Sequence, residues 1–244
     1  MNTEHHSITI SGLQVEIVRK NIKNLHVGVY PPGGRVRVAA PLRVSNDAVR
    51  LAVIGKLGWI KRQQVKFERQ PRESSREMVS GESHYFLGHR YRLRVIQDAA
   101  GNKQSVIVRN KATIELHVHP GTDAGARHRV LAKWYRVQLR ELLGPLLEKW
   151  QKRLGVQVTT LGIKRMKTKW GTCNAEACRV WINLELAKKS SDCLEYVVAH
   201  ELVHLLVRHH DDAFLAIMDR HLPRWRSIRE ELNGSPLAHE IWRE

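Results

Sequence analysis

The stretch 196–210, YVVAHELVHLLVRHH, is the most informative part of this sequence. Up to Val207, every residue in it is apolar or aromatic except His200, Glu201 and His204. This composition predicts a helix that is buried on nearly all sides and carries three ionisable side chains inside the protein. A helix turns by about 100° per residue, so His200 and His204 lie one above the other on one face, with Glu201 beside them.

The three side chains form the H-E-x-x-H arrangement. Two imidazoles one helical turn apart can hold a zinc ion, while the carboxylate between them reaches a zinc-activated water without binding the metal. The alternative is that they are core histidines, because a chain with 14 histidines produces such spacings by chance. The apolar surroundings favour the metal, since an ion takes both nitrogens as ligands and removes the cost of burying them without partners.

The residues on either side of this helix predict its start and a third metal ligand. Asp192 is suited to cap the first turn, and Glu195, three residues later, can close a capping box. A third histidine, His210, lies six residues beyond the pair and can join it if the chain turns after Val207. His209 is the alternative third ligand. A metal site of three histidines is therefore predicted at the end of the helix.

The sequence on both sides of the helix resembles a known family. The segments concerned are KRMKTKWGTC at 164–173, VWINLEL at 180–186, HELVH in the helix, and then His210 and Phe214. Together they resemble the YgjP-type, SprT-related family of zinc-dependent metallopeptidases. Weaker similarity through GRVRVAAP, LGWIKRQ and FLGHRYRLRV extends the resemblance over nearly the whole chain.

This resemblance implies a zinc site formed by His200, His204 and His210, with Glu201 as the general base. The sequence departs from the family pattern in two places. WGTCN stands where the family usually has a serine after tryptophan and glycine, and neither proline nor glycine lies between His204 and His210 to turn the chain. The second departure leaves His209 and His210 both open as the third ligand.

Length and composition limit the class of protein. With 244 residues the chain can bury a full core, and its unlike halves favour two domains over one. No apolar run reaches the roughly 18 residues of a membrane span and no signal-peptide pattern is present, so we expect no membrane association. Three cysteines, Cys173, Cys178 and Cys193, are too few for a disulfide framework, which fits a reducing cytoplasm. Cys173 and Cys178 are expected as small buried side chains rather than metal ligands.

The net charge of +17 bears on the partners of the protein. Lysine and arginine are spread over both halves, which favours contact with polyanions such as nucleic acid. A solvated basic surface without a specific partner is the alternative. No signature of a zinc finger, a helix-turn-helix or an RNA-recognition motif favours sequence-specific binding. We therefore predict a protein or peptide substrate and, beside it, non-specific binding of nucleic acid.

The first half of the chain has the pattern of a β-rich module with one helix. Alternating apolar residues predict strands over 7–40, which include a hairpin with the turn residues PPGG. One helix comes next, capped by Ser45 or Asn46. The polar stretch 70–83, QPRESSREMVSGES, predicts a linker or loop, and two more strands lie beyond it. No catalytic pattern falls in this half.

The second half begins with a long helix from Thr122, in which the Gly144-Pro145 pair predicts a kink or break. Strands over 157–186 come after this helix. The segment 180–186 is either an edge strand, able to pair with an extended substrate, or an ordinary central strand. An edge strand at this point would lie beside the metal helix and position the substrate.

These observations predict an α+β protein. Residues 1–120 form the β-rich N-terminal module, and residues 121–244 form a zincin-like zinc metallopeptidase domain with H-E-x-x-H on a buried helix. The expected activity is hydrolysis of peptide bonds, with Glu201 as the general base and nucleic-acid-associated proteins as one class of substrate. The rival interpretation is a nucleic-acid-binding protein with a structural zinc site, which needs no carboxylate between its histidines.

Overall fold

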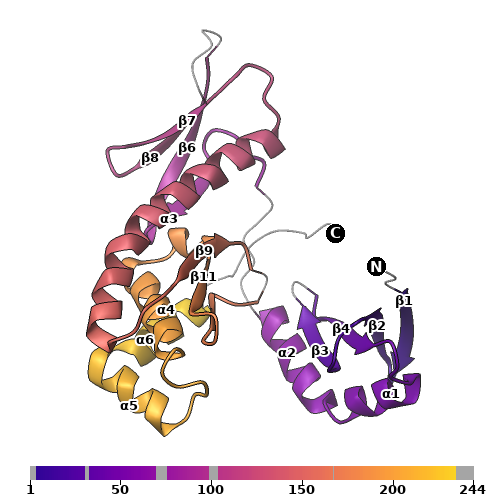
Figure 1. Cartoon of the computed structure of the whole chain (residues 1–244). Coiled ribbons are helices and arrows are strands. Elements are labelled where there is room, and N and C mark those ends of the chain that lie inside the picture. The colour runs from indigo at the N-terminus through magenta and orange to yellow at the C-terminus, as the bar shows by residue number, and fades with distance from the viewer. Residues whose placement is uncertain (1–3, 31–32, 70–75, 99–103, 167, 235–244) are drawn as a thin grey trace. The chain divides into compact units, whose positions relative to one another are not determined.

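The computed structural model of this chain describes residues 4–30, 33–69, 76–98, 104–166 and 168–234. These residues divide into two compact units, which we call the first unit (residues 4–69) and the second unit (residues 76–234) (Figure 1). The border between the units lies in the stretch 70–83 that the sequence predicts as a linker, and not near residue 120. The difference arises because the strands between 83 and 118 pack against the long helix that comes after them.

The first unit is built on a four-stranded sheet. Its strands lie in the order β1-β2-β4-β3, with β2 and β4 parallel and the other neighbours antiparallel. Ser11 and Gly12, both with positive φ, turn the chain from β1 into β2, as in a tight hairpin turn. The strands are β1 Glu4–Ile10, β2 Leu13–Lys20, β3 His26–Tyr30 and β4 Arg35–Pro41.

The single helix predicted after this sheet is two helices. α1 spans Asn46–Ile54 and α2 spans Leu57–Arg69, because Gly55 ends the first of them. Ser45 caps α1, and its hydroxyl accepts a hydrogen bond of 3.2 Å from the Ala48 N–H. Buried side chains of the sheet and of both helices form one apolar core: Ile10, Val15, Ile17, Val29, Val36, Val38, Ala40, Val49, Val53 and Ile60.

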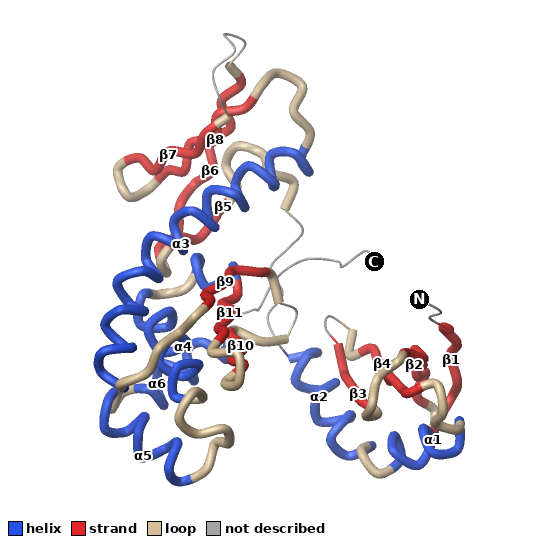
Figure 2. The backbone as a smooth tube through the Cα atoms, in the orientation of Figure 1, coloured by secondary structure: helices blue, strands red, loops and turns tan. Residues whose placement is uncertain are grey.

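The second unit begins with another four-stranded sheet, in the order β5-β6-β8-β7. Figure 2 shows this sheet alongside helix α3, which spans Ala124–Leu154. The Tyr135 hydroxyl of α3 donates a hydrogen bond of 2.7 Å to the Tyr85 carbonyl of β5, which ties the helix to the sheet. The strands are β5 Ser83–Phe86, β6 His89–Gln97, β7 Ser105–Arg109 and β8 Thr113–Val118.

Helix α3 continues through Pro145. Of the kink or break predicted at Gly144-Pro145, the break is therefore wrong, and the kink stays a prediction. Pro145 removes only one backbone donor, and the burial of Leu139, Leu143 and Trp150, each 0% exposed, holds the turns on both sides of it in the core. Neither α3 nor any other helix in the described part of the chain is long and apolar enough to cross a membrane.

A three-stranded sheet comes after α3, in the order β10-β11-β9. The central strand β11 is antiparallel to β10 and parallel to β9. The edge-strand interpretation of 180–186 is therefore wrong, because both sides of β11 are paired and Leu184–Lys188 forms a short 3-10 helix, η1. The strands are β9 Thr160–Lys164, β10 Gly171–Asn174 and β11 Arg179–Asn183.

Three helices complete the second unit: α4 Ser191–Val203, α5 Asp212–His221 and α6 Trp225–Gly234. Ser190 caps α4 through its hydroxyl, so the predicted cap at Asp192 is wrong. Glu195 closes no capping box. Its carboxylate instead accepts hydrogen bonds from Lys149 and Trp150 of α3 and joins the two helices. The chain is thus α+β, as predicted.

Candidate metal centre

Helix α4 carries His200 and Glu201 near its C-terminal end, and His204 is its C-cap. Most of the helix is surrounded by the core of the second unit. Its buried residues are Cys193, Leu194, Tyr196, Val197, Val198, Ala199, Glu201, Leu202 and Val203. This packing fixes the direction in which the polar side chains leave the helix.

The chain turns after α4 without a proline or a glycine. The Leu205 N–H donates to the Leu202 carbonyl at 3.0 Å, and the Leu206 N–H donates to the Val203 carbonyl at 2.9 Å. Bonds to the third residue back tighten the end of a helix. The chain then brings His210 to the C-terminal end of α4, directly before α5 begins.

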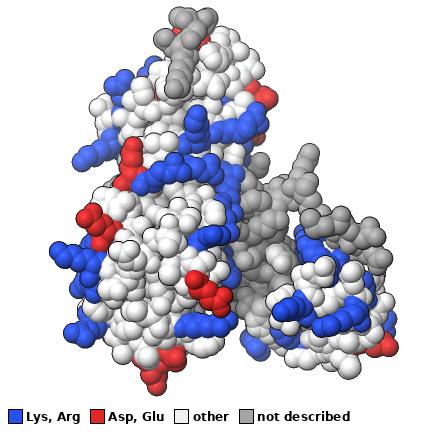
Figure 3. All heavy atoms as spheres, viewed as in Figure 1, with Lys and Arg blue, Asp and Glu red and all other residues white. Residues whose placement is uncertain are grey.

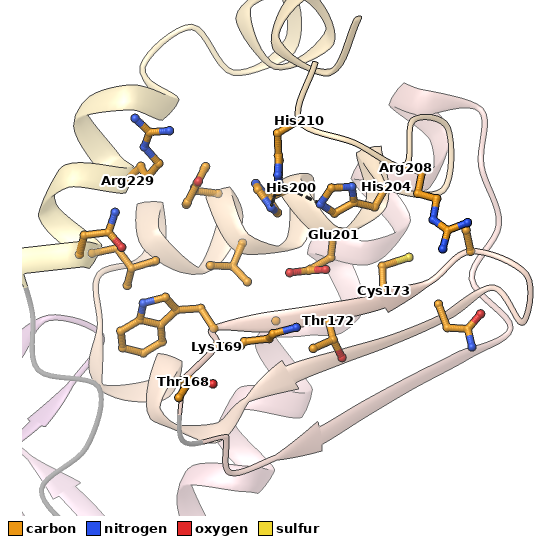
Figure 4. A pocket seen from close by; sticks show the side chains of 18 of the residues that line it. Thr168, Lys169, Thr172, Cys173, His200, Glu201, His204, Arg208, His210 and Arg229 are labelled. Carbon is orange, nitrogen blue, oxygen red and sulfur yellow. Dashed lines mark hydrogen bonds between the residues drawn. The ribbon is translucent and has the colours of Figure 1, made fainter. Parts of the chain in front are cut away.

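Three imidazoles converge at this turn (Figure 4). The Nε2 atom of His210 lies 3.1 Å from the Nε2 atoms of both His200 and His204. In the described part of the chain these residues form the one group of His, Cys, Asp or Glu side chains compact enough to hold a metal ion, with ligand atoms within 4.8 Å of one another. His209 is exposed and lies outside this group. Of the two histidines left open as the third ligand, His210 is therefore the one near the pair.

A hydrogen bond orients the His204 ring, and burial lowers the pKa of the other two rings. The Nδ1 atom of His204 lies 3.1 Å from the Val207 carbonyl, which can only accept, so Nδ1 donates this hydrogen bond and Nε2 faces His210. Burial, together with the neighbouring His204 and His210, lowers the pKa of His200 to about 3. Burial also lowers the pKa of His210. Three imidazole nitrogens placed this close together could hold a metal ion.

Aromatic rings support the three histidines. The ring centroid of Phe214 in α5 lies 5.0, 4.9 and 4.7 Å from those of His200, His204 and His210. The Phe214 N–H donates to Asp211, the N-cap of α5, at 3.1 Å. The imidazoles therefore rest on a ring whose backbone is itself held by a helix cap.

Tyr196 adds a second aromatic contact, which the sequence pattern does not single out. It lies one turn before His200 on α4, and the centroids of the two rings are 5.7 Å apart in an edge-on arrangement. Its other neighbour is Trp225 of α6, whose ring is stacked on it at 6.4 Å. Together these contacts restrict the rotation of the His200 ring.

Glu201 is buried, with 6% of its surface exposed, and it faces the backbone of β10. Burial raises the pKa of Glu201 to about 7, and the positive charge of Lys169 partly opposes this rise. A Cβ atom at Gly171 would lie 2.6 Å from both Cγ and Oε1 of Glu201, so a larger residue there would displace the Glu201 side chain. A carboxyl group with a pKa near neutral can both accept and return a proton under neutral conditions.

A fully buried asparagine, which the sequence pattern does not single out, positions the backbone opposite this carboxyl group. The Nδ2 atom of Asn183 donates to the carbonyls of Met166 at 3.0 Å and Lys169 at 2.8 Å. Its backbone N–H donates to the Trp170 carbonyl at 2.9 Å. These bonds hold the segment that leads into β10. The sequence could have indicated this role, because Asn183 is the one amide side chain in the mostly apolar segment VWINLEL.

The histidines and Glu201 line a cleft of about 830 Å³ between α4 and β10 (Figure 4). Cys173 of β10 also lines it. Burial raises the pKa of the Cys173 thiol to about 11, so it is protonated at neutral pH. Cys173 and Cys178 lie outside the group of three histidines, and all three cysteines are free. The cleft is large enough to hold several residues of a bound chain.

A comparison with models of protein families identifies the family of this chain. The model of the YgjP-like metallopeptidase domain matches residues 23–235. This chain belongs to the YgjP-like family. The match confirms the family predicted from the motifs and makes the YgjP-like chain a metallopeptidase, a hydrolase that works with a metal ion. Its relation to the SprT family stays a prediction.

Two solved structures share limited similarity with this YgjP-like chain. The metallopeptidase zymogen of Pyrococcus abyssi abylysin is 20% identical with a TM-score of 0.34, and the match covers 36% of this chain and 89% of abylysin. The metallopeptidase zymogen of Methanocaldococcus jannaschii jannalysin is 16% identical with a TM-score of 0.32, covering 38% and 92%. A search of curated proteins found no match.

Proposed function

We propose that this YgjP-like protein is a zinc-dependent metallopeptidase of zincin-like architecture, in which His200, His204 and His210 bind zinc and Glu201 is the general base. The observation that carries the proposal is the convergence of three imidazole nitrogens beside a buried carboxyl group. A tetrahedral zinc ion with Zn–N bonds of about 2.0–2.1 Å holds its nitrogens about 3.3 Å apart. The Nε2 separations of 3.1 Å are close to this spacing.

The donor atoms suit zinc better than magnesium or calcium. Those hard cations require mainly oxygen ligands, whereas imidazole nitrogen is a common zinc ligand. The contact between Nδ1 of His204 and the Val207 carbonyl is typical of metal-binding histidines, since it orients the ring and fixes its tautomer. Three protein ligands leave one position for water, which is the arrangement of catalytic zinc sites.

Glu201 is the residue proposed to move the proton during hydrolysis. When bound, zinc lowers the pKa of a coordinated water and polarises the peptide carbonyl. Glu201 accepts a proton from the attacking water and later delivers it to the leaving amine. The close backbone of Gly171 limits the positions open to the carboxyl group and favours a fixed orientation in the cleft.

The proposed substrate is an extended protein or peptide segment that pairs with β10. This strand is an edge of its sheet, because β11 occupies only one side of it. In an antiparallel pair, every second residue of a strand bonds to the neighbouring strand, and the residues between them direct their N–H and C=O groups to the other side. Because the Asn183 N–H bonds to the Trp170 carbonyl, the backbone groups of Gly171 and Cys173 point away from β11. A peptide paired with these groups would lie beside Glu201, held by backbone bonds that require little particular sequence.

A nucleic-acid-binding protein with a structural zinc site is the second candidate. Its support is the net charge of +17, and Figure 3 shows lysine and arginine over both units on the visible face. Closed structural zinc sites carry four protein ligands, however, whereas the group found among the described residues has three. We therefore favour the peptidase and retain nucleic acid as a non-specific second partner.

Metal removal tests the proposed function. Purified protein is expected to contain about one zinc ion per chain, to cleave an unfolded protein such as casein, and to lose this activity with a chelator. Restoring zinc should restore cleavage. Cleavage that survives complete removal of the metal would contradict the proposal. Binding to duplex and single-stranded probes at low and high salt tests the second partner, because phosphate contacts weaken as salt rises.

A further inference from the structure

The walls of the cleft carry three positive side chains that the proposed mechanism does not use. Lys169, Arg208 and Arg229 line the cleft, and apart from Glu201 the acidic residue that lines it is Glu176. All three cations are exposed. The ion pairs found among the described residues of the second unit involve other cations. The guanidinium of Arg229 lies over the Trp225 ring, 4.9 Å from its centroid, a contact that leaves its N–H donors free to bind a carboxylate. The three charges can therefore all be reached by a ligand in the cleft.

The three cations are distributed around the histidines (Figure 4). Arg229 comes from α6 and lies toward one end of the cleft. Arg208 comes after α4 and lies toward the other end, beyond His204. Lys169 precedes β10 and lies near Glu201. An extended chain running along the cleft therefore passes positive charges on both sides of the metal-binding histidines.

These charges share the cleft with the centre of the site. Arg229 and Lys169 line the same cleft as His200 and Glu201. Charges interact more strongly in a cleft than in bulk water, because the effective dielectric constant is lower. A substrate carboxylate bound there would experience the same charges with a favourable sign.

We propose that this cleft selects acidic peptide segments, with Asp or Glu on both sides of the bond that is cut. The inference rests on the proposed peptidase function and names its substrate class. A guanidinium group can bind a carboxylate through two parallel hydrogen bonds, and Arg208 and Arg229 supply one such group toward each end of the cleft. An extended peptide repeats its side chains on one face about every 6.8 Å, so residues near the cut bond on each side can reach these ends.

The same charges act against basic substrates. A lysine or arginine in the bound peptide would face Arg208 or Arg229, and like charges brought together in an interface are costly. Basic proteins that coat nucleic acid are therefore poorer substrates than acidic segments. The preference of the cleft is thus distinct from the nucleic-acid contact predicted from the net charge.

Three internally quenched peptides that differ only in the residues flanking the cut bond test the inference. Glu, Gln or Lys is placed on both sides, and kcat/KM is measured with the zinc-loaded full-length protein. We expect the Glu peptide to exceed the Gln peptide by about 10-fold, as for two partly desolvated ion pairs. The Lys peptide should be the poorest substrate. Both differences should shrink as salt is raised.

Variants assign the preference to individual residues. Arg208→Gln and Arg229→Gln should each lower the Glu-to-Gln ratio by about threefold. Arg208→Glu and Arg229→Glu should each improve cleavage of the Lys peptide relative to the Glu peptide, a gain that misfolding cannot produce. The matched control is Arg140→Gln, which changes an exposed arginine of α3 outside the cleft and should leave the ratios unchanged.

The possible results separate the inference from the function on which it rests. Equal cleavage of the Glu and Gln peptides, unchanged in the variants, overturns the inference and leaves the peptidase intact. No cleavage of casein or of any peptide by zinc-loaded protein overturns the peptidase, and the inference with it. If an oligonucleotide blocks cleavage of the Gln peptide and the Glu peptide is not preferred, the cations serve nucleic acid and the inference is wrong.

Discussion

The two four-stranded sheets of the molecule have the same strand arrangement and differ in the helices that pack against them. Each has a parallel central pair and antiparallel outer pairs, in the orders β1-β2-β4-β3 and β5-β6-β8-β7. Two residues with positive φ turn the first hairpin of each sheet, Ser11 and Gly12 in one and Leu87 and Gly88 in the other. The first sheet closes a core of its own with α1 and α2, whereas the second shares one core with α3 and α4. The helices that pack on a sheet thus determine whether its strands form a separate unit or share a core with the helix that carries the proposed metal site.

The two cores also differ in polarity. The buried polar or charged side chains among the described residues all belong to the second unit: His84, Asn183, Glu185 and Glu201. The core of the first unit is apolar. Burying a polar group costs free energy unless it finds partners. The buried polar side chains therefore occur in the unit that carries the proposed metal site.

The largest effect is expected from removing a metal ligand, and it should be confined to the second unit. His200→Ala should lose zinc and lower peptide cleavage by at least about 100-fold, because the metal supplies the attacking water. His209→Ala changes the neighbouring exposed histidine and is the matched control, which should keep both zinc and activity. Metal content and cleavage are measured on the same samples. Retained zinc in His210→Ala together with lost zinc in His209→Ala would contradict the assigned third ligand.

Two core substitutions test whether the sheets belong to separate cores. Leu139 of α3 and Ile17 of β2 are each 0% exposed, so replacing either by Ala should cost about 2–5 kcal/mol of unfolding free energy. Leu139→Ala should lower the unfolding temperature of the transition that releases zinc. Ile17→Ala should lower a different transition and leave zinc binding and peptide cleavage unchanged. A single transition shifted by both variants would show that the two units unfold as one.

A smaller effect is expected from replacing Asn183, one of the buried polar side chains that are found in the second core and not in the first. Asn183→Ala leaves the carbonyls of Met166 and Lys169 without their donor, and each such loss costs about 1–3 kcal/mol. Cleavage should fall by about 10-fold with zinc retained, because the backbone beside Glu201 loses its anchor. Asn24→Ala, at an exposed position of the first unit, is the control and should change neither property. Full activity in folded Asn183→Ala would show that these bonds do not position the cleft.

Sequence patterns were sufficient where neighbouring residues determine the structure. The apolar run around HELVH predicted a buried helix, and α4 spans Ser191–Val203. The motifs around it predicted the YgjP-like family, which the family match confirms. The polar stretch 70–83 predicted a linker, and the border between the units falls within it. In each case the deciding signal lies within a few residues of the feature.

Two failures are local, the cap of α4 at Ser190 and the division of one predicted helix at Gly55. The others concern contacts between distant residues. β11 is central because β9 and β10 pair with its two sides, which its own apolar residues do not reveal. Glu195 bonds to Lys149 and Trp150 instead of closing a capping box, since α3 packs against α4. The positioning role of Asn183 depends on carbonyls 14 and 17 residues away. Contacts between distant residues such as these can be identified only in the folded structure.

The most direct test of the account is zinc-loaded Glu201→Gln. Because glutamine has the same shape but accepts no proton, the variant should bind as much zinc as the wild type and unfold at the same temperature. Peptide cleavage should nevertheless fall by at least about 100-fold, the usual effect of losing a general base. Cleavage within a few-fold of the wild type by the folded, zinc-loaded variant would contradict the proposed role of Glu201 as the general base.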